Sequence, residues 1–116
     1  MNFEEIREYC LQKKGVAESF PFDETTLVFK VMNKMFCLLG LDDHRISLKN
    51  DRDKNIELRA HYPAIYEGYH LHKQHWNTID LDGTVPSKLL CEMIDASYNL
   101  IVASLTQKLK EELKNL

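Results

Sequence analysis

Apolar residues recur at helical spacing near the start of the chain. The pattern predicts a first helix from about Phe3 to Lys13, with one apolar and one charged side. Asn2 followed three residues later by Glu5 is a variant of the capping box, which favours a helix start at this point. We expect this helix to cover a sheet.

A longer apolar pattern with the same period lies toward the other end of the chain. It predicts one long helix from about Pro86 to Ser104, opened by the proline. Residues 106–113 are rich in lysine and glutamate, and we expect them to form a final turn or helix that frays.

Three short segments between these helices have the composition of strands: residues 26–31, 35–41 and 45–49. Met32-Asn33-Lys34 separates the first two and predicts a hairpin, with Asn33 in the left-handed conformation. Because the connections are short, the pattern favours an antiparallel meander.

The middle of the chain predicts a short helix over residues 51–62, capped by Asn50 or Asp51. We expect residues 64–69 to form a crossing loop. Residues 68–83 are expected to begin with a loop at Gly68 and then to form an extended segment that ends at the turn dipeptide Asp82-Gly83.

Residues 16–24 are predicted to be a loop that contains Phe20-Pro21-Phe22. Two aromatic rings around a proline make a stiff apolar segment, and we interpret it as core packing at the end of the sheet. A ligand-binding aromatic pair is the alternative, at roughly one chance in ten beside core packing.

Together these elements predict one α+β domain over residues 1–116. It has an N-terminal helix, an antiparallel sheet of about five strands, and a long C-terminal helix on the same face. The hydrophobic content of 44% and the charged content of 28% are ordinary for a soluble globular protein. The three cysteines include no Cys-x-x-Cys pair, and neither a signal-peptide pattern nor a membrane-length apolar run is present. We therefore expect a cytoplasmic protein with reduced thiols.

The net charge of −3 does not favour nucleic-acid binding, but its distribution is uneven. Residues 44–75 hold six bases against four acids and contain all five histidines. This part becomes more positive as the pH falls toward 6.

The candidate nucleic-acid residues lie in and around this positive part. Lysine can bind phosphate, asparagine can read a base edge, and tryptophan can stack on an unpaired base. For the tryptophan we favour packing by roughly three to one. The candidates are Lys30, Lys34, Lys49, Arg59, Lys73, His75, Trp76 and Asn77.

Residues 68–78 also carry a family resemblance. Gly68-Tyr69-His70, a basic residue and then His75-Trp76-Asn77-Thr78 resemble the MmcQ/YjbR family, as do Phe20-Pro21-Phe22, Lys49-Asn50-Asp51 and Leu58-Arg59. The resemblance implies a frataxin-like arrangement and a double-wing DNA-binding-like domain. One wing would be the hairpin at Asn33-Lys34 and the other the loop around Lys73.

The histidines raise the question of a metal site. Along a strand His70 and His72 share a face, whereas His75 points to the other. We therefore put a physiological metal site at roughly one chance in ten and expect neither metal nor cofactor. A frataxin-like metal site on the acidic face of the first helix (Glu4, Glu5, Glu8) ranks last, because the helix dipole already explains those acids.

The sequence contains no catalytic motif, so we expect no enzyme. The first hypothesis is a small cytoplasmic binding domain with weak DNA binding through a wing-like basic edge. The alternative is a protein-interaction or regulatory module with no nucleic-acid role, which would present the tryptophan edge to a polypeptide partner. Neither hypothesis involves a membrane.

Overall fold

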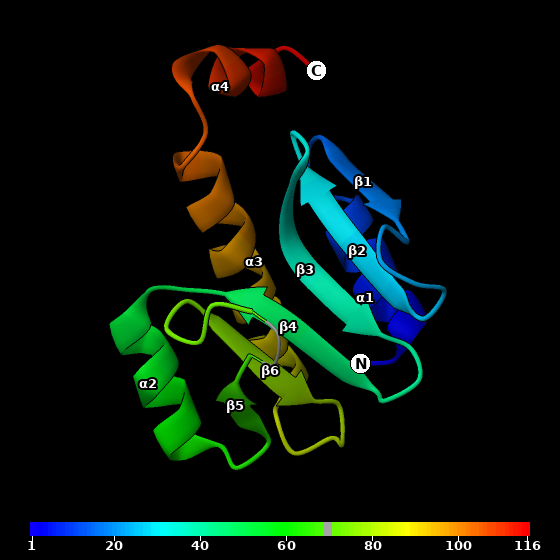
Figure 1. Ribbon diagram of the computed structural model, residues 1–116, viewed down its shortest axis with the longest axis vertical. Coiled ribbons are helices and arrows are strands. Elements are labelled where there is room, and N and C mark those ends of the chain that lie inside the picture. The colour runs from blue at the N-terminus through cyan, green and yellow to red at the C-terminus, as the bar shows by residue number, and fades with distance from the viewer. Residues whose placement is uncertain (69–70) are drawn as a thin grey trace.

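Over residues 1–68 and 71–116, which the computed structural model describes, six strands form one antiparallel sheet in the order β1-β2-β3-β4-β6-β5 (Figure 1). The strands are β1 (Val16–Ser19), β2 (Thr26–Val31), β3 (Lys34–Gly40), β4 (Arg45–Lys49), β5 (Ile65–Glu67) and β6 (Trp76–Asp80). The helices are α1 (Phe3–Leu11), α2 (Arg52–His61), α3 (Ser87–Ala103) and α4 (Gln107–Lys114). The expected α+β class is confirmed.

Helices α1 and α3 lie behind the sheet in Figure 1, on the same side. Leu39, Ile46 and Ile79 pair with one another across β3, β4 and β6, so their side chains lie on the same face of the sheet. This is the face that the two helices cover. All three are fully buried, together with Ile94 of α3. We call this side of the sheet the helix face and the opposite side the open face.

The open face carries the alternate residues of each strand. Within the described residues no helix covers it, and it faces the viewer in Figure 1. Its side chains include Thr26, Lys30, Leu38, Arg45, Ser47, Lys49, Trp76 and Thr78.

Ser97 of α3 joins β3 to β4 where the two strands separate. Their pairing runs from Gly40–Arg45 to Cys37–Leu48 and goes no further. Beyond that point the N–H of Lys49 donates to Ser97 Oγ (2.9 Å), and Ser97 Oγ donates to the carbonyl of Phe36 (2.5 Å). One buried hydroxyl therefore satisfies two backbone groups that the sheet leaves unpaired.

The sheet has more strands than the five expected, because β1 and β5 lie in segments predicted to be loops. Each is an edge strand with a single neighbour. In β1 half-buried and exposed residues alternate, and β5 has only three residues. Short edge strands of this kind lack the apolar run that marks a buried strand in a sequence. Residues 69 and 70, predicted to belong to the loop and to the extended segment, lie outside the described residues.

The hairpin between β2 and β3 has the predicted position and a tighter turn than expected. Val31 pairs with Lys34, so the loop has only two residues. Both have positive φ, Met32 at 47° and Asn33 at 67°, as a type I′ turn requires. Asn33 confirms the prediction, whereas Met32 was not expected to be left-handed. Asp51 is the N-cap of α2, and its side chain accepts from the N–H of Lys54 (2.9 Å).

The C-terminal helix α4 is packed, although the sequence predicted fraying. Thr106 caps it, and Leu113 is buried. Gly15, at φ +75°, lets the loop after α1 approach this leucine, since a Cβ there would lie 2.5 Å from Leu113 Cδ1. Lys14 Nζ also donates to the carbonyl of Lys114 (2.8 Å). A few apolar positions in a charged helix were enough to anchor it.

The prediction that Phe20-Pro21-Phe22 packs in the core is wrong. Phe20 is 48% exposed and Phe22 is 63% exposed. The segment follows the edge strand β1 and borders the open face, where no helix of the described residues is available to cover it.

Other sequence expectations concern thiols and membranes. Cys10 and Cys37 are buried free cysteines, and Cys91 is half-buried and free. Among the helices of the described residues, none combines the length and the apolarity that a bilayer crossing demands.

The first prediction concerns Ser97. Replacing it (Ser97→Ala) leaves the N–H of Lys49 and the carbonyl of Phe36 without their shared partner, so the free energy of unfolding should fall by about 1–3 kcal/mol. Urea denaturation measures this. The matched control is Ser87→Ala, an exposed serine at the start of the same helix, which should change stability by less than about 0.5 kcal/mol. Equal midpoints for the two variants would show that the bridge does not hold the strands.

Candidate functional site

Two of the predicted lysines lie at the same level on the open face. Phe29 of β2 and Leu48 of β4 both pair with Cys37 of β3, and β2 and β4 run in the same direction. Lys30 and Lys49 are the next residues on their strands. They therefore point from the open face at the same end of the sheet, one on each side of β3.

Two further lysines border this pair. Lys34 follows the hairpin turn just beyond Lys30. It pairs with the buried Val31, so its side chain leaves the strand on the side of the helix face. Lys73 belongs to the turn before β6, which is attached to the end of β4 because the N–H of Asn50 donates to the carbonyl of His75 (2.9 Å). We call Lys30, Lys34, Lys49 and Lys73 the basic end of the sheet. Among residues 1–68 and 71–116, no carboxylate lies within 4.0 Å of these four amino groups.

Arg59 and Asn77 are not part of this surface. Asn77 is 2% exposed and pairs with Leu48, which points to the helix face. Arg59 Nη1 donates to Asn77 Oδ1 (2.8 Å), and Asn77 Nδ2 donates to the carbonyl of Asn55 (3.2 Å). Asn55 Nδ2 in turn donates to the carbonyl of Gln74 (3.3 Å). This buried network joins α2 to β6 and to the Lys73 turn, and it leaves the Asn77 amide no free edge for a base.

Trp76 lies on the open face but is only 7% exposed, as the sequence argument favoured. The backbone of Gly68 lies against it: the N–H of Gly68 donates to the Trp76 carbonyl (2.9 Å), and a Cβ at Gly68 would lie 3.0 Å from Trp76 Cβ. A tryptophan with so little exposed surface cannot stack on a base or anchor a polypeptide in this conformation.

The histidines considered as metal ligands do not form a group of three within the described residues. His72 and His75 lie with ring centroids 4.8 Å apart, and His70 lies outside the described residues. Across residues 1–68 and 71–116 no group of three potential ligands converges. On the acidic face of α1, Glu5 accepts from the N–H of Asn2 (3.0 Å) in the capping box.

The opposite end of the open face is acidic. Arg45 Nε lies 3.4 Å from Asp80 Oδ1, and Arg45 Nη1 lies 3.7 Å from Asp43 Oδ2. Tyr66 donates to Asp80 Oδ1 (2.7 Å); burial and this hydrogen bond raise the pKa of Tyr66 to about 12. Asp23, also at this end, accepts from two backbone N–H groups, of Thr25 and Thr26, which lower the pKa of its carboxyl. We call Asp23, Asp43 and Asp80 the acidic end.

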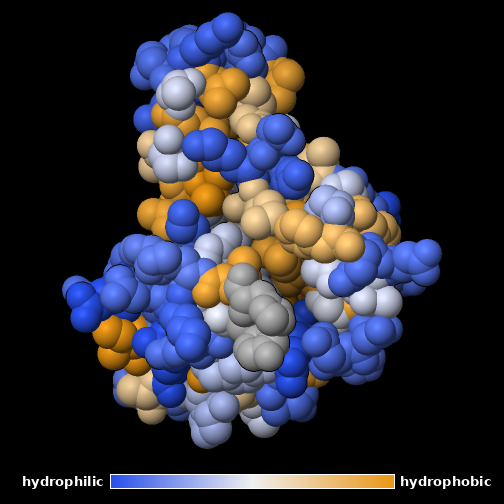
Figure 2. Space-filling view, in the orientation of Figure 1, coloured by the Kyte–Doolittle hydropathy of each residue, from blue (hydrophilic) through white to orange (hydrophobic). Residues whose placement is uncertain are grey.

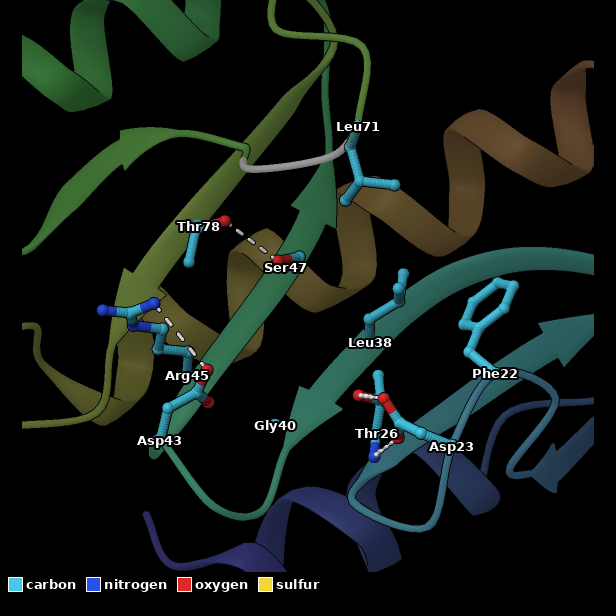
Figure 3. Close-up of a pocket in the computed structure, with 10 residues that line it drawn as sticks. All are labelled: Phe22, Asp23, Thr26, Leu38, Gly40, Asp43, Arg45, Ser47, Leu71 and Thr78. Atoms are coloured by element: carbon cyan, nitrogen blue, oxygen red, sulfur yellow. Dashed lines mark hydrogen bonds and ion pairs between the residues drawn. The ribbon is translucent and has the colours of Figure 1, made fainter.

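A pocket of about 410 Å³ lies on the open face and extends into the acidic end, where Asp23 and Asp43 line it (Figure 3). Leu38, Ser47 and Thr78 form its floor in one cross-strand row, and Ser47 Oγ lies 3.0 Å from Thr78 Oγ1. Phe22 stands at one side and Leu71 at the other (Figure 3). The remaining lining residues are Asp23, Thr26, Gly40, Asp43 and Arg45.

Sequence reasoning missed this pocket. Its floor comes from strands whose polar residues resemble ordinary solvent-facing positions, and the depth of a sheet surface depends on long-range pairing. One signal was present: in Arg45-Ile46-Ser47-Leu48-Lys49 every second residue is polar, which is typical of a strand with one uncovered face.

The family model described as YjbR matches residues 11–100, which include the whole sheet. The chain belongs to the YjbR family. It is similar to protein YjbR of Escherichia coli K12, with 30% identity over 118 residues and 100% of both chains covered. It is also similar to protein YbdF of Escherichia coli O157:H7, with 31% identity over 109 residues, 90% of this chain and 88% of the other.

Solved structures support the same assignment. The crystal structure of Deinococcus radiodurans protein DR2400, a DUF419 domain, is 41% identical with a TM-score of 0.89, covering 96% of this chain and 86% of the other. A Pseudomonas syringae protein is 25% identical with a TM-score of 0.73, covering 86% and 98%. The resemblance to the MmcQ/YjbR family that the sequence predicted is confirmed.

The second prediction separates structural from binding cations. Replacing Arg59 by methionine (Arg59→Met) keeps the aliphatic part of the side chain and removes the donor to Asn77 Oδ1. Because that acceptor is buried, the free energy of unfolding should fall by about 1–3 kcal/mol. Thermal or urea denaturation measures this loss. The control is Arg52→Met, an exposed arginine at the start of the same helix, which should be nearly neutral. A neutral Arg59→Met would return Arg59 to the candidates for ligand binding.

Proposed function

We propose that this YjbR-family chain is a cytoplasmic binding domain, not an enzyme, and that it binds DNA weakly through the basic end of the sheet. The observation that carries the proposal is that Lys30, Lys34, Lys49 and Lys73 lie at one end of the sheet, with Lys30 and Lys49 on its open face. Lysines without carboxylate partners attract phosphates, and phosphate contacts supply most of the affinity in non-specific DNA binding.

The placement of the lysines supports a two-armed contact. The β2–β3 hairpin extends beyond Lys30, and the Lys73 turn borders the end of β4 that carries Lys49. These are the two segments that the family description would make wings. The hairpin turn is well suited to a protruding arm, because a two-residue type I′ turn is rigid and matches the twist of its strands.

The proposed binding is weak because the net charge is −3 and because the acidic end lies on the same face. Non-specific binders have dissociation constants of about 1–100 μM at physiological salt, and this chain should lie at the weak end of that range or beyond it. Four phosphate contacts at most limit the log–log salt slope to about −4.

A protein-interaction module is the alternative. Its anchor would be the exposed phenylalanines and not Trp76, which the sequence analysis considered. Trp76 is covered, whereas Phe20 and Phe22 are exposed large apolar side chains at the border of the open face. Exposed aromatic groups of this kind occur at protein interfaces. This alternative predicts binding that depends on the phenylalanines and not on the lysines.

The third prediction tests the DNA proposal. The double variant Lys34→Glu, Lys73→Glu should abolish binding of a short duplex at low salt, measured by fluorescence anisotropy. Its melting temperature should stay nearly unchanged, because both lysines are exposed.

The matched control is Lys88→Glu, Lys108→Glu, which makes the same change in net charge on exposed residues of α3 and α4. It should weaken binding only slightly. If both double variants weaken binding equally, net charge and not the basic end is responsible. If the wild type binds no oligonucleotide at low salt and pH 6, the DNA proposal is wrong.

A further inference from the structure

The pocket on the open face lies directly beside the basic end. Ser47, on its floor, is two residues before Lys49 on β4, which is about 7 Å along the strand. Leu38 pairs with Ser47, and Lys30 occupies the next open-face position on β2 after Val28, which pairs with Leu38. A phosphate held between Lys30 and Lys49 would therefore lie one step from the pocket.

Phe22 does not pack in the core and borders the pocket. Its ring is 63% exposed and stands at the side of the pocket (Figure 3). The next residue, Asp23, fixes the loop by accepting from the backbone N–H groups of Thr25 (2.9 Å) and Thr26 (2.7 Å). The ring therefore stands at the border of the pocket, directly before a turn that these hydrogen bonds fix. An aromatic face in that position can stack on a flat ligand.

The pocket has a suitable size and polarity for a flat heteroaromatic group. Its volume of about 410 Å³ is near the lower end of the range for ligand pockets, about 300–1,000 Å³. Leu38 and Leu71 supply apolar contacts, and the hydroxyls of Ser47 and Thr78 can both donate and accept. Figure 2 shows apolar surface gathered at the centre of the same side of the molecule.

Asp43 adds an acceptor that faces this space. Its Oδ2 lies toward Arg45, whereas its Oδ1 lies over Gly40, so close that a Cβ at that position would come within 2.2 Å of it. A carboxylate oxygen can accept from the amino or imino groups of a base. Because the acidic end repels phosphates, a bound chain would keep its backbone at the basic end and direct a base toward the acidic one.

We propose that this pocket holds one unpaired base of a single-stranded nucleic acid, stacked on Phe22, while the basic end holds the neighbouring phosphates. This deepens the proposed DNA binding, on which it rests, by naming single strands as the preferred form. In a duplex the bases are paired and stacked, so they cannot enter a pocket in a sheet, whereas an unpaired base can turn out of its strand.

The experiment compares three labelled oligomers of equal length, about eight nucleotides, by fluorescence anisotropy at low salt. They are a mixed-sequence DNA single strand, the corresponding duplex, and an oligomer of abasic spacers that carries the phosphates without bases. The single strand should bind about tenfold more tightly than the other two. An RNA single strand of the same sequence shows whether the 2′-hydroxyl is read in addition.

Two variants test the role of the ring. Phe22→Ala should weaken binding of the base-containing single strand by about tenfold and leave binding of the abasic oligomer unchanged. Ile56→Ala is the matched control, since Ile56 is a 46% exposed apolar residue on α2 and does not line the pocket. It should bind all oligomers like the wild type. Melting curves verify that both variants are folded, as the exposure of both side chains leads us to expect.

The outcomes distinguish this inference from the proposed function. If single strand, duplex and abasic oligomer bind equally and Phe22→Ala changes nothing, the base pocket is wrong while phosphate binding by the lysines survives. If Phe22→Ala weakens the abasic oligomer as much as the base-containing strand, stacking is likewise wrong. If no oligomer binds, the proposed function fails and the base pocket fails with it.

Discussion

The structure depends on the coverage of one sheet from one side. Each strand presents alternate residues to two surfaces, and the helices α1 and α3 bury only one of them. The apolar set on the helix face supplies the hydrophobic stabilisation, so the open face is free to carry lysines, hydroxyls and carboxylates. Ser97 then completes the hydrogen bonding where β3 and β4 separate under α3. Because the hydrophobic core forms on the helix face, polar and charged side chains on the open face do not disrupt it.

The elements that could be predicted were those whose signal is local. The helices of residues 3–13 and 86–104 showed a full apolar period, and the hairpin showed an asparagine at its turn. The edge strands β1 and β5 were missed because edge pairing depends on the neighbouring strand and leaves little trace in four or three residues. Phe22 was assigned to the core because a sequence shows that a residue is apolar and not which face of the sheet the helices occupy.

The lysines of the candidate site could be predicted from the sequence, but their positions relative to one another on the sheet could not. Lys30 and Lys49 are 19 positions apart and become neighbours across β3 only through the register of two strand pairs. Asn77, by contrast, shares the segment of Lys73 and Trp76, yet alternation turns it to the helix face, where Arg59 binds it. One step along a strand therefore separates a residue that can meet a ligand from one that stabilises the fold.

The buried network behind the open face connects these two roles. Asn55 Nδ2 donates to the carbonyl of Gln74, Asn77 Nδ2 donates to the carbonyl of Asn55, and Arg59 donates to Asn77 Oδ1. The turn that carries Lys73 is therefore positioned from the helix side. A lysine on an otherwise flexible turn loses less conformational entropy on binding when that turn is already fixed. The opposite border shows the same principle, because Asp23 braces the loop that presents Phe22. The Lys73 turn and the loop of Phe22 are thus both fixed by hydrogen bonds that lie outside the proposed contacts, which is the arrangement that a preorganised binding surface requires.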